Sequence, residues 1–539
     1  MELLLNLTIY FPLVGILLFL FFRSDTAVKW ISLIVTSITF MLSLPLLFGF
    51  DVAGSAVPQY VTEGSPILAG MDIKYLVGLD GLSLLLFMLT TLFGPIVILS
   101  SWNSVKKSLI GYYSMLLILQ MASLGVFASL DLVVFYVFFE LSLIPMYFLI
   151  GIWGGSDKIR ATIKFFIYTL VGSLIMLVAL MYLGFHAGAA MGGDISFTAD
   201  WRYISGPDYL IGLAEQTWLF LAFALAFCIK VPLFPFHTWL PYAHTEAPTA
   251  GSVVLAAIML KLGTYGLVRV CLPVFPNAFM EFAPWMATLA VIGIIYGALV
   301  AMVQKDVKKL VAYSSVSHLG FVVLGIFALN TVAVQGAIIQ MINHGLSTGA
   351  LFLIVGMIYD RAHTRQISDF GGVAKVMPVF AVMFMIATLA SIGLPGLNGF
   401  VGEFLILNGA FISTLYANKV YAVLAATGVI LAAVYMLWMY QRVMFGPITN
   451  KENEKLIDLD AREISLLVPL VIFMIWIGIR PVDFTKYSEE WVESFIEMSE
   501  EKSEAVMLQT DLSEIPDWTA RLYGVEARQL LTADVGGRK

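Results

Sequence analysis

The stretch from Phe227 to Gly266, FCIKVPLFPFHTWLPYAHTEAPTAGSVVLAAIMLKLGTYG, decides both the fold class and the kind of function. An apolar run ends at Lys230, and two prolines then break the helix. A second lysine, Lys261, lies inside the next apolar run. A charged side chain at membrane depth costs at least about 2.5–3.5 kcal/mol, and broken helices are tolerated there only where they are buried in protein or line a cavity. The stretch therefore predicts a polar path for an ion or substrate inside an apolar bundle.

The composition of the whole chain is that of a membrane protein with many spans. Of its 539 residues, 60% are hydrophobic and 12% are charged, whereas soluble domains are roughly half apolar and about a quarter charged. The two cysteines, Cys228 and Cys271, both lie in apolar runs, which argues against disulfides and a cysteine-ligated metal. No nucleotide loop, haem motif or iron–sulfur motif occurs. We expect no cofactor, no metal and no nucleic acid partner.

Fourteen segments have the roughly 20 apolar residues that a transmembrane helix needs. They are 3–22, 28–50, 79–100, 109–128, 130–152, 162–187, 211–231, 247–271, 283–303, 309–329, 332–358, 377–412, 421–446 and 464–480. The twelfth is too long for one span and contains IGLPGLNG at 392–399, which predicts a second broken helix. The predicted fold class is an all-α membrane protein of about fourteen transmembrane helices, with the seventh and the twelfth broken.

Basic residues are distributed unevenly between the two sets of loops. Loops after odd-numbered segments hold seventeen: Arg23, Lys29, Lys106, Lys107, Lys158, Arg160, Lys164, Lys305, Lys308, Lys309, Arg361, Arg365, Lys375, Arg442, Lys451, Lys455 and Arg462. Loops after even-numbered segments hold four: Lys74, Arg202, Arg269 and Lys419. Because loops rich in Lys and Arg stay in the cytoplasm, the odd loops are predicted to be cytoplasmic and both termini to lie on the other side.

The remaining segments are predicted to be surface structure. Two long loops, 51–78 and 188–210, are expected to cover the side opposite the basic loops. The tail that begins at Thr485 is acidic and polar, and apolar residues recur at helical spacing within 487–498. This pattern predicts an amphipathic helix that lies on a membrane or a partner, or that stays solvated.

Six ionisable residues remain at membrane depth: Glu140, Lys230, Lys261, His318, His344 and Glu403. Such residues typically mark ion paths and proton relays. If Glu140 faces Lys230, the pair can act as a switch, because a lysine keeps its proton beside a carboxylate and releases it more readily when the carboxylate withdraws. The structural alternatives are a static ion pair and, for Lys261, a side chain that reaches for the membrane interface.

The histidines favour a proton relay over a metal site. His318 and His344 lie on consecutive predicted helices beside serines and a threonine, whose hydroxyl groups can hold water. A lone histidine is more often a core residue, but this pair favours a relay. His237, inside the first break, is a further candidate for the path. The spacing of His237, His244 and Glu246 fits no metal motif, so His244 and Glu246 are expected to satisfy the connecting turn.

The two breaks predict an internal repeat. They lie five helices apart, one carrying Lys230 and the other followed by Glu403. Matching interrupted helices in two halves point to a transporter's site, and because five is odd the second unit would be inverted. The chain then divides into helices one to three (1–108), a first five-helix unit (109–271, spans four to eight), its inverted counterpart (283–446, spans nine to thirteen), a loop with the last helix (447–484) and the acidic tail (485–539).

Four segments resemble signature segments of the antiporter-like subunits of respiratory complex I. They are KVPLFPFHTWLPYAHTEAPTAGSVVLAAIMLKLGTYG at 230–266, KKLVAYSSVSHLGF at 308–321, NHGLSTGALFL at 343–353 and GLPGLNGFVGEF at 393–404. The resemblance covers nearly the whole chain apart from the tail and the exposed loops. HTEAPTAGSVVLA, and Glu403 where related types usually have lysine, favour the M type over the L and N types.

The resemblance implies that the six buried ionisable residues belong to the half-channels and central axis of a proton-translocating membrane-arm subunit of NADH:quinone oxidoreductase. A proton would reach Lys261 or Lys230 from the basic side through His318 or His344, pass to Glu403 and leave on the opposite side. The chain would be part of a translocase but would have no redox centre of its own. It would lie in an energy-conserving membrane, such as the bacterial inner membrane.

The implied partners are the lipid bilayer, subunits of the L and N types and the small membrane subunits. Quinone, and NADH or ferredoxin, would bind only to other subunits. The alternative is a subunit of a multisubunit Na⁺/H⁺ antiporter or of a membrane-bound hydrogenase, since these share the fold and most of the buried charges. Six buried ionisable groups disfavour a purely structural scaffold.

Overall fold

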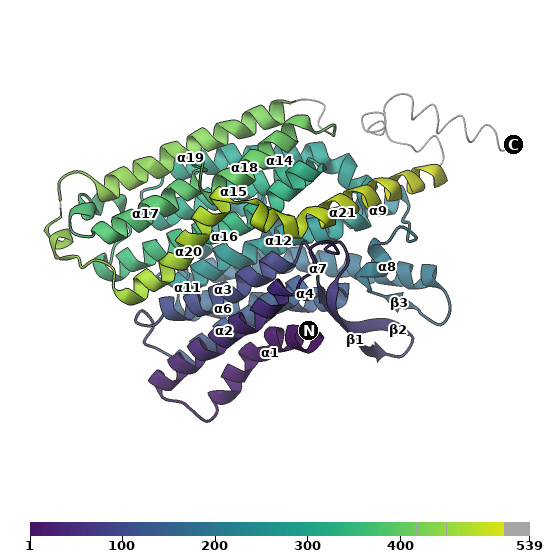
Figure 1. Ribbon diagram of the computed structural model, residues 1–539, viewed down its shortest axis with the longest axis horizontal. Helices are drawn as coiled ribbons and strands as arrows, with labels where there is room; N and C mark the ends of the chain where they lie inside the picture. The colour runs from purple at the N-terminus through teal and green to yellow at the C-terminus, as the bar shows by residue number, and fades with distance from the viewer. Residues whose placement is uncertain (416–418, 449, 511–539) are drawn as a thin grey trace.

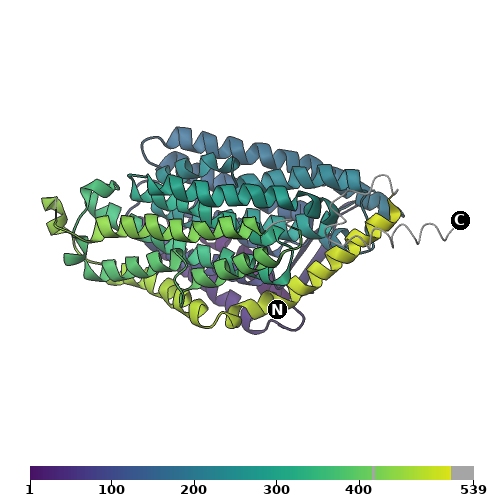
Figure 2. The ribbon, with the colours of Figure 1, turned by 90° about the horizontal axis from the view of Figure 1, so that it is seen from above.

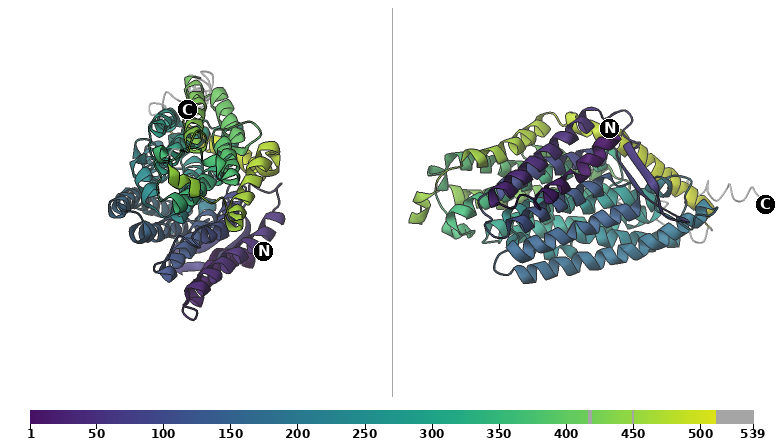
Figure 3. Two further views of the ribbon diagram at one scale, coloured as in Figure 1. Left: turned by 90° about the vertical axis from the view of Figure 1, so that its left-hand side faces the viewer. Right: turned by 90° about the horizontal axis from the view of Figure 1, so that it is seen from below.

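The structure, a computed structural model, describes residues 1–415, 419–448 and 450–510. Long helices lie side by side in one elongated bundle (Figures 1 and 3). Eleven helices in the described part are long and apolar enough to cross a membrane, and four shorter apolar helices, α1, α3, α17 and α18, accompany them. The predicted mainly helical, many-span architecture is confirmed, while the count of fourteen spans stays a prediction.

The elements follow one another in three groups. The first contains α1 (Glu2–Leu18), α2 (Asp25–Phe48), β1 (Gln59–Leu68), β2 (Met71–Leu79) and α3 (Leu84–Ser100). The second contains α4 (Leu109–Ala128), α5 (Leu132–Leu141), α6 (Leu143–Trp153), α7 (Lys158–Met191), β3 (Phe197–Thr198), α8 (Trp201–Ser205), α9 (Leu213–Lys230), α10 (Leu240–Glu246), α11 (Thr249–Val254), α12 (Leu260–Gly266) and α13 (Leu272–Val274). The third contains α14 (Pro276–Met302), α15 (Val307–Phe327), α16 (Thr331–Ala362), α17 (Pro378–Ser391), α18 (Asn398–Ile412), α19 (Val420–Met444), α20 (Ala461–Ile479) and α21 (Val482–Gln509).

The prediction of an all-α fold is wrong at the two long loops. β1 and β2 form an antiparallel hairpin, and β3 joins β2 in parallel to make a three-stranded sheet. The turn between the hairpin strands contains Gly70 at φ +77°, a backbone conformation that glycine adopts without strain. The last four residues of β2, Leu76 to Leu79, are all buried, so this half of the strand is covered on both faces.

An ion cluster fixes the hairpin to the loop that follows α7. Lys74 Nζ lies 2.8 Å from Glu63, 3.3 Å from Asp72 and 3.3 Å from Asp200. Desolvation opposes the charge of Lys74, but these carboxylates outweigh it and raise the pKa of the lysine above its ordinary value. The two long loops are therefore one ordered surface rather than separate covers.

The bundle has two chemically different ends. The sheet and α8 lie at the right-hand end in Figure 1, which we call the sheet end. The opposite end, which we call the mouth end, holds the α3–α4 loop with Lys106 and Lys107 and the α16–α17 loop with Arg365. Two of the loops predicted to be cytoplasmic therefore lie at the same end of the bundle.

The helices that carry Lys261, His318 and His344 lie at the centre of the bundle. In the most apolar window of each helix, the buried share is 100% for α11–α13, 94% for α15 and 100% for α16, against 33% for α2 and 33% for α19. Charged and imidazole groups on the central helices are therefore shielded from lipid by other helices. This is the setting in which polar groups persist at membrane depth.

Both predicted breaks are present. At the first, Pro232 has no N–H to offer Cys228, so the Cys228 carbonyl accepts from Leu233 N at 2.8 Å. The indole of Trp239 donates to the Ile229 carbonyl at 2.9 Å. At the second, between α17 and α18, Gly393 has φ +72° and Gly396 φ +93°, so the chain turns where other residues would be strained.

The start of the predicted tail is a longer helix than its apolar pattern indicated. α21 runs from Val482 to Gln509 and lies obliquely across the sheet end (Figure 2). Its apolar face, with Trp491, Val492 and Phe495 buried, packs on the chain's own helices α3, α13, α14, α16 and α20. The alternatives of a membrane, a partner or bulk solvent against that face are therefore wrong. Residues 511–539 lie outside the described residues.

Candidate functional site: a buried polar axis

Four of the predicted site residues form one polar line through the centre of the bundle. Lys261 Nζ lies 2.7 Å from Nδ1 of His344. The ring centroids of His344 and His318 are 6.1 Å apart, and Nδ1 of His318 lies 3.0 Å from Oε1 of Glu403. Each of the four residues is at most 3% exposed. The axis thus joins α12, α16, α15 and α18, and crosses from the first predicted unit into the second.

The backbone around Lys261 is unusual and helps to aim the lysine. π-helical turns at Leu255–Met259 and Leu267–Cys271 flank α12, and such turns occur frequently at functional sites. The Lys261 ammonium donates to the carbonyl of Ala256, inside the first π turn. Gly345 lets α16 approach that turn, because a Cβ there would lie 3.0 Å from the Ala257 carbonyl oxygen. This close approach brings His344 to Lys261.

The Glu403 end of the axis has polar neighbours that sequence reasoning missed. Gln340 Nε2 lies 3.4 Å from Glu403 Oε1, and Ser391 Oγ lies 3.3 Å from Nε2 of His318. Ser391 is the last residue of α17, directly before the break. The sequence offers a signal for Ser391, which is a hydroxyl residue next to a helix interruption. It also offers one for Gln340, which lies one helical turn before His344 and so faces the same side of the helix.

Glu140 and Lys230 lie apart from the axis and are not in direct contact. Lys230 Nζ is 3.3 Å from Ser142 Oγ and 4.6 Å from the centre of the Phe139 ring. Glu140 is only partly buried and interacts with Lys230 through charge, without a direct ion pair among the described contacts. The two residues therefore do not form an ion pair among the described contacts, and the gate made by this pair stays a prediction. Lys230 itself is 2% exposed.

The two histidines of the first break have different settings. His237 packs between the rings of Phe234 and Tyr296, at 5.7 and 5.1 Å, and does not join the axis. The imidazole of His244 is fully buried and stacks on Phe352 at 4.4 Å. Neither of its nitrogens has a hydrogen-bond partner among the described residues. The expectation that His244 satisfies the connecting turn is therefore wrong for its side chain.

The Glu246 carboxylate satisfies a different turn from the expected one, since its Oε2 accepts from Asp157 N, in the α6–α7 connection, at 2.9 Å. It also lines a wide cavity at the mouth end, together with Lys106, Lys107, Asp360 and Arg365. The innermost cation of this cavity is Lys308, which donates to the Ala247 carbonyl at 2.6 Å. Lys308 is 7% exposed and lies in the first turn of α15, so its assignment to a loop is wrong.

His244 lies between the mouth and the axis. It is close enough to both Lys308 and Lys261 for their charges to act on it, and it acts in turn on His344. Sequence reasoning missed Lys308 and His244 because neither belongs to an apolar run. Lys308 and His244 are therefore candidates for a link between the mouth and Lys261.

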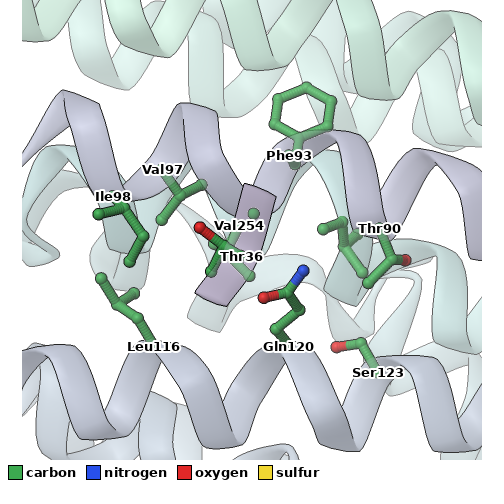
Figure 4. A pocket seen from close by; sticks show the side chains of 11 residues that line it. Thr36, Thr90, Phe93, Val97, Ile98, Leu116, Gln120, Ser123 and Val254 are labelled. Atoms are coloured by element: carbon green, nitrogen blue, oxygen red, sulfur yellow. The ribbon is translucent and has the colours of Figure 1, made fainter. Parts of the chain in front are cut away.

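A second, smaller cavity lies beside the helix that carries Lys261. Its volume is about 20 Å³, and it is lined by residues of α2, α3, α4 and the start of the π turn. Gln120 points into it near Thr90 and Ser123 (Figure 4). Neither Oε1 nor Nε2 of Gln120 has a hydrogen-bond partner among the described residues. Because no ionisable group lines this cavity, it is not part of the axis.

Arg269 is a further buried charge that the sequence placed in a loop. It lies in the π turn that follows α12 and is 2% exposed. Its guanidinium bonds Asp80 through two nitrogens, at 2.5 and 2.7 Å. Arg269 lies near the end of the predicted span 247–271. It was counted among the basic loop residues, although its side chain is buried.

Comparisons of the sequence point to one family. A profile described as NADH:quinone oxidoreductase/Mrp antiporter, TM matches residues 129–450. NADH-quinone oxidoreductase subunit M of Rhodobacter capsulatus is 45% identical over 468 residues, which cover 85% of this chain and 88% of the relative. NADH-ubiquinone oxidoreductase chain 4 of Marchantia polymorpha is 42% identical over 492 residues, covering 91% and 96%.

Comparisons of the structure agree. A chain of respiratory complex I from Thermus thermophilus with bound NADH superposes with a TM-score of 0.81 at 31% identity, covering 92% of this chain and 99% of that one. A chain of the Mrp complex from a Dietzia species gives a TM-score of 0.78 at 19% identity, covering 93% and 99%, which shows a shared fold. This multi-pass membrane protein therefore belongs to the family of antiporter-like transmembrane subunits of NADH:quinone oxidoreductase, and within it to the subunit M (chain 4) group.

Proposed function

We propose that this chain translocates protons as a membrane-arm subunit of NADH:quinone oxidoreductase. The observation that carries the proposal is a line of two contacting titratable pairs, Lys261–His344 and His318–Glu403, whose histidine ring centroids are 6.1 Å apart. Lysine, histidine and glutamate can each gain and lose a proton, so the line can pass protons in a dry interior. The names of the similar proteins support the same enzyme class.

Protons enter at the mouth end in this proposal. The cavity there is open to solvent and leads to Lys308, which is followed inward by His244 and then Lys261. Lys308, His244 and Lys261 form no direct hydrogen bonds with one another among the described contacts. Water molecules therefore complete this part of the relay in our proposal, as they do in other buried polar sites. The proton then passes along the axis to Glu403 and leaves at the sheet end.

The Glu140–Lys230 pair is the gate of this path. The open arrangement leaves Lys230 with a serine hydroxyl and an aromatic ring as its neighbours. Closure of the pair would hold a proton on Lys230, and opening would free it for transfer toward Lys261. α9, which carries Lys230, packs against α12 near Gly263, so a movement at the gate can reach the helix of Lys261.

Moving one charge against the membrane potential costs about 2.3 kcal/mol per 100 mV. We propose that quinone reduction in other subunits supplies this energy and that neighbouring membrane subunits, of the L and N types and the small ones, transmit it. The same proposal includes fourteen spans, an inverted repeat of spans four to eight and nine to thirteen, a bacterial inner-membrane location and the mouth end facing the cytoplasm. The concentration of basic loops at the mouth end supports this orientation.

The proposal is tested by Lys261→Met in the assembled complex, reconstituted in liposomes. Methionine has a similar length and no titratable group, so the line would be interrupted with little change in packing. We expect assembly to be retained and most proton pumping and coupled quinone reduction to be lost. Lys375→Met, at an exposed lysine in the loop before α17, is the matched control and should behave as wild type. Undiminished pumping by an assembled Lys261→Met complex would refute the proposal.

A further inference from the structure

Arg269 lies at the centre of a closed cluster at the sheet end. Its Nε donates to the Tyr265 hydroxyl at 2.9 Å, and its other two nitrogens bond Asp80. Asp80 also accepts from the indole of Trp491 at 3.1 Å. The indole of Trp201 donates to the Arg269 carbonyl at 2.8 Å. We call these five residues the Arg269 cluster.

The cluster is dry and tightly covered. Asp80, Tyr265 and Trp491 are fully buried, and Arg269 and Trp201 are at most 3% exposed. The guanidinium carbon lies 4.5 Å from the Trp201 ring, 5.1 Å from the Tyr265 ring and 5.8 Å from the Trp491 ring. Aromatic rings on three sides leave the ion pair no contact with solvent, and its polar groups are satisfied within the cluster.

The cluster lies directly beyond Lys261 on the same helix. Lys261, Tyr265 and Arg269 follow one another at intervals of four residues, which places them on one helix face. Eight residues correspond to roughly 12 Å along the axis. This face is therefore a direct polar route from Lys261 toward the sheet end. A proton that took it would bypass His344, His318 and Glu403.

We propose that the Arg269 cluster is a seal that prevents protons on Lys261 from leaving directly at the sheet end, so that they pass to His344 instead. This inference rests on the proposed function. Two physical properties make the cluster a barrier. Arginine cannot be deprotonated in proteins, so it cannot relay a proton. The aromatic rings packed around the Asp80–Arg269 pair also exclude the water that would otherwise carry a proton past it.

The seal gives the C-terminal helix a role. α21 supplies Trp491 to the cluster and is hydrogen-bonded to the rest of the chain at several further places along its length. Glu490 accepts from Ser55 N at 3.1 Å, and Lys502 donates to the carbonyls of Ile204 and Pro273 at 3.0 and 3.2 Å. α21 is therefore the lid that keeps water away from the Asp80–Arg269 pair.

The test measures passive proton leak through the assembled complex in liposomes without turnover, together with the number of protons pumped per electron. Arg269→Ala should raise the leak several-fold and lower the pumping ratio, while quinone reduction persists. Trp491→Phe, which removes one hydrogen bond and keeps the ring, should raise the leak less and serves if Arg269→Ala fails to assemble. Wild-type leak in both assembled variants would overturn the proposal.

The double variant Asp80→Leu with Arg269→Met separates a seal from a relay. Apolar replacement of both members of a buried ion pair is often neutral or stabilising, and a dry apolar plug still blocks protons. We expect wild-type leak and wild-type pumping. Loss of pumping without leak would show that the pair carries protons and would overturn the seal. Neither result depends on Lys261→Met, so failure of the proposed function and failure of the seal are distinguishable.

Discussion

Two clusters of buried charge lie on the same helix and differ in every property that matters for proton transfer. On the axis, Lys261 and His344 are 2.7 Å apart, and Nε2 of His344 has no hydrogen-bond partner among the described residues. In the Arg269 cluster, the guanidinium bonds a carboxylate and a phenol. One cluster has titratable groups with unused hydrogen-bonding capacity, and the other has a permanent cation whose partners are all in place.

The difference shows that burial of charge alone does not mark a proton path. A path needs groups that can gain and lose a proton and that can exchange their partners. His244, whose ring nitrogens have no partner among the described side chains, shares these properties with the axis. A fully satisfied ion pair supplies rigidity instead, since breaking it leaves an uncompensated charge.

The largest expected effect on this comparison comes from Glu403→Gln. Glutamine keeps the size and can accept from His318, but it cannot take up a proton. We expect proton pumping to fall by about 10²-fold or more, the range for a positioned acid or base, in complexes that assemble normally. Pumping is measured with a pH-sensitive dye in liposomes.

The matched control for that variant is Glu452→Gln. Glu452 is exposed and pairs with Lys455 at 2.8 Å on the surface, so its loss should leave pumping unchanged. If Glu403→Gln pumps as well as this control, Glu403 is a structural acceptor and the axis ends at His318.

A smaller effect is expected at Lys502, a third kind of buried cation. Its ammonium has carbonyl oxygens as acceptors, and burial lowers its pKa to about 7 from an ordinary value of 10.5. A lysine whose pKa is lower in the folded than in the unfolded state opposes docking when it is protonated. The docking of α21 should therefore strengthen as pH rises from about 7 toward 10.5.

Hydrogen exchange of the α21 amides, corrected for intrinsic rates, measures this docking. Protection should increase between pH 7 and pH 9 in the wild type, whereas in Lys502→Met it should be independent of pH. Lys486→Met, at a partly exposed position on the same helix, should keep the wild-type pH dependence. Protection that falls as pH rises would contradict the expected sign.

Much of the fold follows from the sequence because the bilayer imposes simple requirements. Apolar runs of about 20 residues must be helices, and prolines and glycines must interrupt them, as they do at Pro232 and Gly393. The sheet was missed and α21 was predicted too short because both lie outside those runs. There, strand pairing and packing against distant segments decide the structure, as the parallel pairing of β2 with β3 illustrates.

The candidate residues of the axis could be chosen from the sequence, but their grouping could not. A buried histidine or lysine is visible as an ionisable residue in an apolar run. Whether Lys261 contacts His344 or Lys230 depends on the packing of α16 at Gly345 and on the π turns, which no local pattern indicates. Arg269 and Lys308 were counted as loop residues although both lie in helical turns. Both are within a few residues of a predicted helix end, and an apolar pattern does not locate a helix end that closely.

The smallest effect is expected at Gln120. This residue tests whether unpartnered polar atoms matter for pumping when the group cannot titrate. Its amide resembles the axis in having unpartnered polar atoms, but an amide cannot gain or lose a proton at ordinary pH. Gln120→Leu should leave pumping unchanged and should maintain or raise the thermal unfolding temperature, because an unsatisfied buried polar group costs about 1–3 kcal/mol. A loss of pumping would show that unused hydrogen-bonding capacity is sufficient to mark the path, and that titration is not required.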